Sequence, residues 1–455
     1  MNQDSRSSFT GKLGFVLAAA GASVGLGNIW RFPYLAAKYG GGVFLLVYIL
    51  LALTFGYTMI IAETSIGRMT KKSPVGAFEA LSSSRLMHAG GWINAVIPIL
   101  IVPYYSVVGG WVCKYVFEYL RGGTQQLAED NYFSEFMTSG SGPELWFIVF
   151  AALVLLVILL GVENGIERVS GFMMPILLVL AVIISIYSVT RPGALTGLRY
   201  FLIPDFSRFT WMTVVSAMGQ MFYSLSIAMG ILITFGSYMK RETSIERSTS
   251  QVEIFDTGIA ILAGVMIIPA VFSFSGGDSA ALSQGPSLMF VTMPKIFAKM
   301  GFGRLIGLLF FVLVLFAALT SAIALCESAV STLVDELGWG RTASTVLVGA
   351  IMLGLGTLSS LGYGPLSGIT IIGMPFLDFF DFLTNSVMMP IAALFICALV
   401  VRHIGMDRIE AEVTTDGHPF RRKKIFRFMI CYLCPLFVLI ILLSSVASVL
   451  GFIRI

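Results

Sequence analysis

Long apolar stretches recur along the whole chain, each of them long enough to cross a hydrocarbon core of roughly 30 Å as a helix. Of the 455 residues, 57% are hydrophobic and only 12% are charged, a balance that a soluble domain does not show. The solvent for most side chains is therefore lipid. We predict an all-α polytopic membrane protein with eleven spans, at 11–37, 42–67, 90–120, 144–161, 170–190, 209–238, 254–275, 303–334, 342–361, 376–401 and 428–451.

The loops between these stretches are too short to fold alone, which predicts a single membrane domain over 1–455. Basic loops resist translocation. If the N-terminus is cytoplasmic, 18 of the 29 Lys and Arg residues fall on the cytoplasmic side, including the densest run, Arg421 to Lys424. We therefore expect a cytoplasmic N-terminus and an external C-terminus. The net charge of +4 reflects these loops, and it gives no reason to expect a nucleic-acid partner.

The first and sixth spans each contain a seven-residue stretch poor in bulky side chains, 21–27 and 224–230. Three residues of the first stretch are glycines, and each weakens a helix by about 1 kcal/mol relative to alanine. Backbone that unwinds inside a membrane has to line a cavity or bind something. Interruptions at matching places in two halves of a chain point to a transporter site near the middle of the bilayer.

Two simpler interpretations compete for the first stretch. Gly21 and Gly25 form a GxxxG pattern, which favours close helix packing. With Ser23 they also form GxSxG, the pattern of a serine hydrolase, which needs a histidine base. A nucleophile near mid-membrane cannot reach a loop histidine, so we expect no enzyme here. The three histidines lie in or beside predicted cytoplasmic loops: His88, His403 and His418.

Ionisable and hydroxyl side chains inside the spans are the next candidates, because a charge at the bilayer centre is costly and usually functional. For Glu63 we expect a structural role, satisfying amides that an unwound helix leaves unpaired. Thr320 and Ser321 offer hard oxygen ligands of the kind that cations take, although such hydroxyls often bond back to their own helix. The other ionisable candidates are Arg31, Asp256, Glu327, Asp381 and, near a span end, Asp335.

The segment 20–33, AGASVGLGNIWRFP, closely resembles the first-helix signature of the neurotransmitter:sodium symporter family, from which the rule about matching interruptions is itself drawn. Further segments resemble the family at 63–68, 104–105, 220–238, 256–257, 319–321, 335–336 and 377–382. The resemblance implies the LeuT-type fold, with unwound first and sixth helices. Its five-plus-five inverted repeat would place helices 1–5 at 11–190, helices 6–10 at 209–401 and an additional helix at 428–451.

Two sodium sites follow from the resemblance, with no organic cofactor. One takes carbonyls of the first helix and groups of the eighth, here Gly21, Val24, Ala317, Thr320 and Ser321. The other touches the substrate carboxylate and would use the Ser23 carbonyl, Asn28, Ser224 and Asp256.

The same resemblance implies an amino-acid substrate. Its carboxylate would meet the amides of Leu26 and Gly27 and the Tyr105 hydroxyl, beside Ser321. Its ammonium group would meet Ser23, Tyr223, Ser224 and Ser226, while Ile101, Met229 and Leu325 would wall a hydrophobic side chain. Arg31 and Asp381 would gate the outer side, and Arg6 and Asp335 the inner side.

Three positions depart from the family pattern: Tyr223 stands in place of Phe, Ala228 in place of Gly, and the acidic Asp256 where animal members use chloride. We expect sodium-coupled, chloride-independent uptake of a small hydrophobic amino acid across a bacterial inner membrane. Asp256 would bind a proton once sodium leaves, giving proton counter-transport, because low dielectric disfavours an isolated carboxylate. We expect a monomer or weak homodimer in the lipid bilayer. The alternative is a sensor or channel-like relative without coupled flux.

Overall fold

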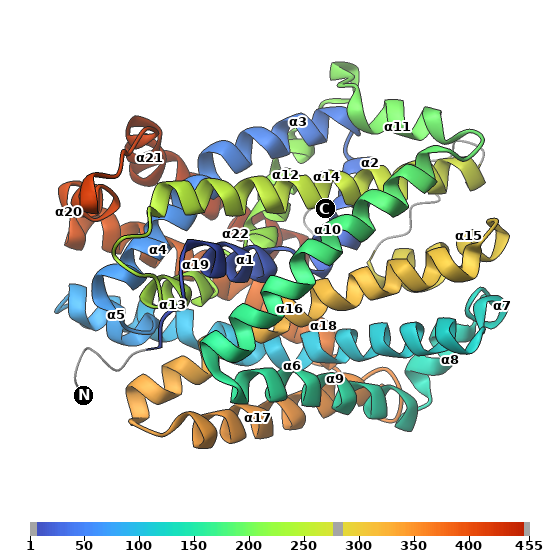
Figure 1. Ribbon diagram of the computed structural model, residues 1–455, viewed down its shortest axis with the longest axis horizontal. Helices are drawn as coiled ribbons and strands as arrows, with labels where there is room; N and C mark the ends of the chain where they lie inside the picture. The colour runs from blue at the N-terminus through green and yellow to red at the C-terminus, as the bar shows by residue number, and fades with distance from the viewer. Residues whose placement is uncertain (1–6, 276–284, 450–455) are drawn as a thin grey trace.

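The computed structural model describes residues 7–275 and 285–449, and the long helices run side by side along its longest axis (Figure 1). The longest are α6 (Arg85–Arg121), α16 (Gly303–Leu337) and α14 (Ile245–Ser275). Other helices that form the spans are α1 (Lys12–Ser23), α2 (Phe32–Lys38), α3 (Gly42–Leu51), α4 (Tyr57–Thr70), α9 (Ser141–Leu159), α10 (Arg168–Val189), α12 (Trp211–Ser224), α13 (Ile231–Ser237), α17 (Arg341–Leu361), α18 (Phe376–Asp381), α19 (Met389–Ala398), α21 (Lys423–Phe428) and α22 (Cys434–Val449).

Shorter helices and π-helical stretches connect or extend these elements. Several spans continue through a π-helical stretch, as between α3 and α4 or between α18 and α19. The connecting helices are α5 (Pro74–Leu81), α7 (Thr124–Leu127), α8 (Tyr132–Thr138), α11 (Ala194–Leu202), α15 (Met293–Lys299) and α20 (Met406–Val413). The π-helical stretches are Gly27–Arg31, Ala52–Gly56, Val162–Glu167, Leu288–Thr292, Phe382–Met388, Leu399–Ile404 and Met429–Leu433.

The predicted spans are present in the described residues. Nine helices are long and apolar enough to cross a membrane, and the pair Lys12–Ser23 with Gly27–Lys38 passes the same test as one span bent by 55°. The remaining predicted span, 209–238, is divided between α12 and α13. The two largest differences are in where spans begin: α14 begins at Ile245 rather than 254, and the fifth span begins at Val162 rather than 170. Both starts are polar turns, which a hydropathy argument misses.

Both predicted interruptions exist, and the first is narrower than predicted. Helix α1 continues to Ser23, and the chain leaves helical geometry at Val24, before the π-helical stretch begins at Gly27. The second interruption occupies 225–230, where Ser226 and Ala228 take positive φ values of 52° and 58°. Left-handed backbone is unfavourable for residues with a Cβ, so surrounding contacts have to hold this segment in place.

The broken helices lie among buried helices, and lipid-facing helices surround them. In their most apolar windows, 83% of α6 and 72% of α16 are buried, against 33% of α9. Helices α4 and α13 approach closely through glycine, since a Cβ on Gly67 would lie 1.9 Å from the Ile233 carbonyl oxygen. This contact fixes the second half of the sixth span, α13, against the second span.

Gly67→Ala tests that close approach. Alanine there pushes α4 away from α13, and we expect a cost of about 1–3 kcal/mol, seen as a lower apparent Tm in detergent. Gly171→Ala on α10 is the control, because a Cβ there meets nothing within 4 Å and alanine favours the helix. Equal Tm values for the two variants would contradict the contact.

Candidate functional site

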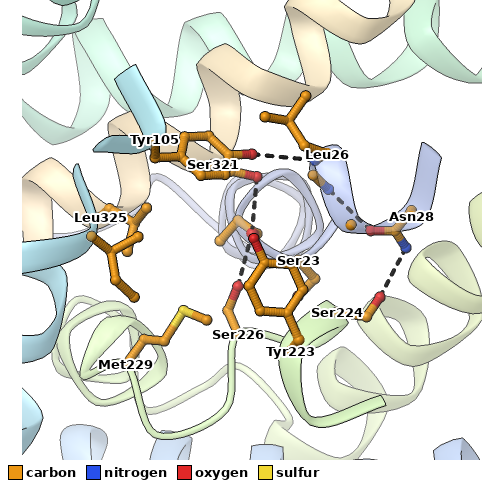
Figure 2. A pocket seen from close by; sticks show the side chains of 14 residues that line it. Ser23, Leu26, Asn28, Tyr105, Tyr223, Ser224, Ser226, Met229, Ser321 and Leu325 are labelled. Carbon is orange, nitrogen blue, oxygen red and sulfur yellow. Dashed lines mark hydrogen bonds between the residues drawn. The ribbon is translucent and has the colours of Figure 1, made fainter. Parts of the chain in front are cut away.

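A small cavity of about 30 Å³ lies between the two helix breaks (Figure 2). Its walls come from α1, α6, α12, α16 and the irregular segment 225–230. The cavity has room for about two water molecules, so a bound amino acid requires its walls to move apart. The lining includes Ala22, Gly25 and Asn28. It also includes all eleven residues predicted above to bind the substrate, which are Ser23, Leu26, Gly27, Ile101, Tyr105, Tyr223, Ser224, Ser226, Met229, Ser321 and Leu325.

Backbone donors converge on the first break. The amide of Leu26 donates to the Tyr105 hydroxyl at 3.2 Å, and the amide of Gly25 donates to Asn28 Oδ1 at 3.1 Å. Only glycine fits at position 25, because a Cβ would lie 2.9 Å from Ser321 Oγ and 3.0 Å from the Tyr105 hydroxyl. These donors can hold a carboxylate, as the N-terminal ends of helices do.

A buried cluster of polar side chains around one carboxylate, here called the acidic cluster, lies beside this break. Asp256 is fully buried on α14, and its carboxylate accepts hydrogen bonds from the Asn28 amide at 2.8 Å and from Ser224 Oγ at 3.0 Å. Tyr48 also donates to it, at 3.3 Å. All three partners are neutral, so the carboxylate has no cation among them. Such an oxygen-rich, negatively charged position fits a sodium ion.

Two details of this cluster differ from the sequence analysis. Tyr48 was not predicted, although a tyrosine hydroxyl inside an apolar span was a usable signal. Asn28 turns its amide nitrogen toward Asp256 and its oxygen toward the Gly25 amide. The side-chain amide therefore has to rotate before its oxygen can coordinate an ion at this position.

Carbonyl oxygens converge on α16 at a second position. The Ser321 hydroxyl lies 3.2 Å from the Gly21 carbonyl, 3.1 Å from that of Ala22 and 3.3 Å from that of Val24. One hydroxyl proton satisfies only one of these acceptors, which leaves oxygen atoms for a cation. The Thr320 hydroxyl lies 2.9 Å from the Phe316 carbonyl and 3.2 Å from the Ala317 carbonyl, both within its own helix. Of the predicted set, Ser321 thus lies against the carbonyls of Gly21 and Val24, with Ala22 as an unpredicted neighbour, whereas Thr320 bonds back to its own helix.

The simpler interpretations of 21–25 can now be judged. Ser23 donates to the Ala19 carbonyl at 3.1 Å within its own helix, and within residues 7–275 and 285–449 it has no histidine partner. Close packing does occur, since a Cβ on Gly21 would lie 3.0 Å from Thr320 Cβ. The same glycines therefore serve both the packing against α16 and the helix break.

Glu63 has the structural role predicted for it. Its carboxylate accepts the amide of Ala228 at 2.8 Å and so pairs a donor that the broken sixth span leaves free. Ser226 Oγ donates to the Ala22 carbonyl at 3.0 Å, which joins the two irregular segments directly. The second break is therefore held from two sides.

A larger cavity of about 430 Å³ lies beyond the central one and includes Arg31 and Asp381 in its lining. Tyr105 and Tyr223 line both cavities and so separate them. Arg31 lies over the Tyr223 ring at 5.3 Å, and Asp381 accepts the Asn385 amide at 2.6 Å, whereas Arg31 and Asp381 form no ion pair in the described structure. The predicted outer gate is therefore not closed here.

Helices α13 and α16 are in contact on the side predicted to face the cytoplasm. Thr234 on α13 is fully buried, with its hydroxyl 3.3 Å from Ser328 Oγ on α16. Asp335 accepts the amide of Ser73 at 2.7 Å. Its predicted gate partner, Arg6, lies outside the described residues.

Comparison with known proteins decides the family. The model of the sodium:neurotransmitter symporter family matches residues 6–138 and 136–452. This chain belongs to that symporter family. It is 32% identical to the uncharacterized sodium-dependent transporter YhdH of Bacillus subtilis, over 98% of this chain and 99% of YhdH. It is also 28% identical to the human sodium- and chloride-dependent GABA transporter 2, over 76% of this chain and 67% of that protein.

A solved structure extends the comparison to the fold. The crystal structure of MhsT in complex with L-phenylalanine matches with a TM-score of 0.87 at 35% identity, covering 97% of this chain and 100% of that one. The predicted symporter family and its LeuT-type fold are thereby confirmed. The protein is a multi-pass membrane symporter with sodium dependence, from a family of transporters rather than enzymes.

Asp256→Asn tests the acidic cluster of this symporter. Asparagine keeps the hydrogen-bonding shape but removes the charge, so we expect sodium affinity to fall by at least about tenfold, or about 1.4 kcal/mol. Thermal stabilisation by NaCl relative to KCl measures it. Asp130→Asn is the control, because Asp130 is an exposed partner of Lys295. Unchanged sodium affinity in Asp256→Asn would remove Asp256 from the ion site.

Proposed function

We propose that this protein imports a hydrophobic amino acid by sodium-coupled symport through alternating access. The observation that carries the proposal is the pair of oxygen clusters on either side of the first helix break, one around Asp256 and one around Ser321. Gly25, Leu26, Gly27 and Asn28 of the break line the central cavity. A zwitterion bound there would lie within reach of both cations.

The coupling between ion and substrate is electrostatic. Ser224 lines the central cavity and also donates to Asp256, so the cavity and the acidic cluster share a wall. A substrate carboxylate at the Leu26 amide would add a negative ligand to the sodium ion nearby. Each ligand then raises the affinity for the other, and this reciprocity lets a sodium gradient drive accumulation.

The side chain of the substrate would lie against Ile101, Met229 and Leu325, which present an apolar wall. The L-phenylalanine in the related MhsT structure supports a hydrophobic substrate. Met229 is flexible enough to fit aliphatic or aromatic side chains. We propose leucine, isoleucine, valine, methionine and the aromatic amino acids as the candidates to screen.

The proposed cycle exchanges two gates. Arg31 and Asp381 would pair above Tyr223 when substrate is bound, and the contact between α13 and α16 would part afterwards. Each gate can contribute only a few kcal/mol, since either has to open within one cycle. We further propose that two sodium ions are transported per cycle. The N-terminus would be cytoplasmic and the C-terminus external. The two inverted repeats would be 11–190 and 209–401.

A thermal-shift screen of the twenty amino acids, with NaCl or KCl, tests the symport proposal. A ligand that binds the folded protein raises its apparent Tm, and we expect stabilisation by hydrophobic amino acids only in NaCl. Thr320→Ala with Ser321→Ala should abolish that stabilisation while leaving the protein folded. The matched control is Thr138→Ala with Ser139→Ala, which removes adjacent hydroxyls near α8. Retained sodium dependence in the double variant at 320–321 would exclude the second ion site, and binding without uptake into proteoliposomes would favour a sensor.

Chloride and protons give a separate test of Asp256. We propose that its fixed charge takes the place of a bound chloride ion and that it carries a proton outward when sodium leaves. Replacing chloride with gluconate should leave uptake unchanged, while a pH dye in the proteoliposome lumen should report alkalinisation during sodium-driven uptake. Loss of uptake without chloride would contradict the first proposal, and a constant lumenal pH would contradict the second.

A further inference from the structure

Residues 406–422 form a strap that joins the tenth and eleventh spans, on the side that the proposed topology assigns to the cytoplasm. The strap contains α20 and a turn at Thr415–Gly417, and it leads into α21. Figure 1 shows α20 and α21 at the same end of the molecule as α13 and the start of α14. The strap is more than a connection, because buried charged groups fasten it to two other spans.

The first anchor is Arg68 at the inner end of α4. Its side chain is fully buried, and Nε forms an ion pair with Glu412 of the strap at 2.5 Å. One guanidinium nitrogen donates to the Thr243 carbonyl at 2.6 Å, and another donates to the Glu412 carbonyl. A single guanidinium therefore joins the second span, the loop before α14 and the strap.

The second anchor is Glu246 in the first turn of α14. Its carboxylate accepts the amides of Arg421 at 2.9 Å and Arg422 at 3.0 Å, and it accepts the Tyr57 hydroxyl at 2.9 Å. A buried carboxylate thus satisfies two backbone donors of the strap. It holds the strap to α14 and α4 together.

The third anchor is the ion pair of Arg422 with Glu253, at 3.1 Å. The Glu253 side chain is only 2% exposed, and the guanidinium of Arg422 also lies 4.6 Å from the centre of the Tyr57 ring. Glu253 stands one helical turn before Asp256 on α14. The strap is therefore bound by an ion pair to α14, the helix that carries Asp256 of the acidic cluster.

Helices α4 and α14, to which the strap is anchored, pack against the broken helices. Helix α4 lies along α13, and α14 lies along α1. If α1 and α13 are to part from α16 and release substrate inward, α4 and α14 have to follow or be sheared from them. The strap is the connection between the tenth and eleventh spans and ties α4 and α14 to it, and all its anchors are formed while Thr234 is buried.

We propose that the strap is a brake on inward opening. Its anchors stabilise the inward-closed arrangement and have to loosen when α13 leaves α16. Glu253 and Arg422 are positioning residues in this role, since neither lines the central cavity. The proposal rests on the alternating access proposed above, and it adds the element that sets the balance between the two states.

The test measures how readily the inner side opens. Thr234→Cys, in a chain whose five cysteines are replaced by alanine, places a thiol in the contact between α13 and α16. Its reaction with a maleimide reports opening. Arg422→Met with Glu253→Gln removes the ion pair without leaving a buried charge, and we expect labelling to accelerate by about tenfold. Labelling at the parent rate, in a folded protein, would overturn the brake.

A matched control uses the neighbouring ion pair. Lys423 and Glu410 pair at 2.5 Å, but Lys423 is half exposed and neither residue belongs to α4 or α14. Lys423→Met with Glu410→Gln should stay within about twofold of the parent rate, as exposed pairs contribute little. If the double variant Arg422→Met with Glu253→Gln does not fold, Arg422→Lys takes its place as the test. Lysine keeps the positive charge but loses the planar guanidinium that lies over the Tyr57 ring. This variant should label about threefold faster, and the parent rate would again contradict the brake.

The same assay separates the two proposals. Labelling of the Thr234→Cys parent should change between NaCl and KCl if the protein alternates under sodium control. A sodium-insensitive parent would contradict the proposed symport. The brake is judged only by the ratio of the variant rate to the parent rate.

Discussion

Two breaks in the helical backbone at the centre of the protein impose the main constraint on the rest of the structure. Amides and carbonyls freed inside a membrane need partners, since lipid offers none. Side chains from other helices supply them: Tyr105 meets the Leu26 amide, Glu63 meets the Ala228 amide, and Gln220 donates to the Gly27 carbonyl at 3.1 Å. Each break is stable only while these neighbouring helices stay in place, so local irregularity and global packing are coupled.

The distribution of charge follows from the same constraint. In the described residues, the buried ion pairs lie toward the helix ends, as with Arg68 and Glu412 or Arg341 and Glu327. Beside the central cavity, Asp256 meets neutral donors instead. A carboxylate left without a fixed cation in low dielectric favours a mobile cation, whereas a fixed guanidinium there would compete with it. Fixed pairs therefore suit the ends, where they can bias conformation, and the unpaired acid suits the centre.

Several parts of the candidate site could be read from the sequence because their signals are local. Glycine enrichment marks the first break, and Thr320 and Ser321 stand out as adjacent hydroxyls inside an apolar span. Other parts left a weaker signal or none. Tyr48 resembles any aromatic residue of a span until the fold brings it to Asp256, and Ala22 contributes only a carbonyl that every residue has.

The strap at 406–422 shows the limit of hydropathy most clearly. Glu246 and Glu253 precede the predicted start of the seventh span at 254, so they could be taken for loop residues. They are buried in α14 against protein rather than lipid. Hydropathy measures the preference of a segment for hydrocarbon, and it cannot distinguish an exposed polar turn from one whose partners arrive from elsewhere in the chain.

By itself, the sequence determined the approximate positions of the spans and of the two breaks, and the kinds of ligand available at them. These properties depend on residues close together in the chain, through helix propensity and transfer into lipid. Only the tertiary structure decided which oxygens converge, how the Asn28 amide points and what Arg422 holds. Those contacts join residues as far apart as Arg68 and Glu412, and no local preference specifies a partner at that separation. Packing of the whole helical assembly selects it.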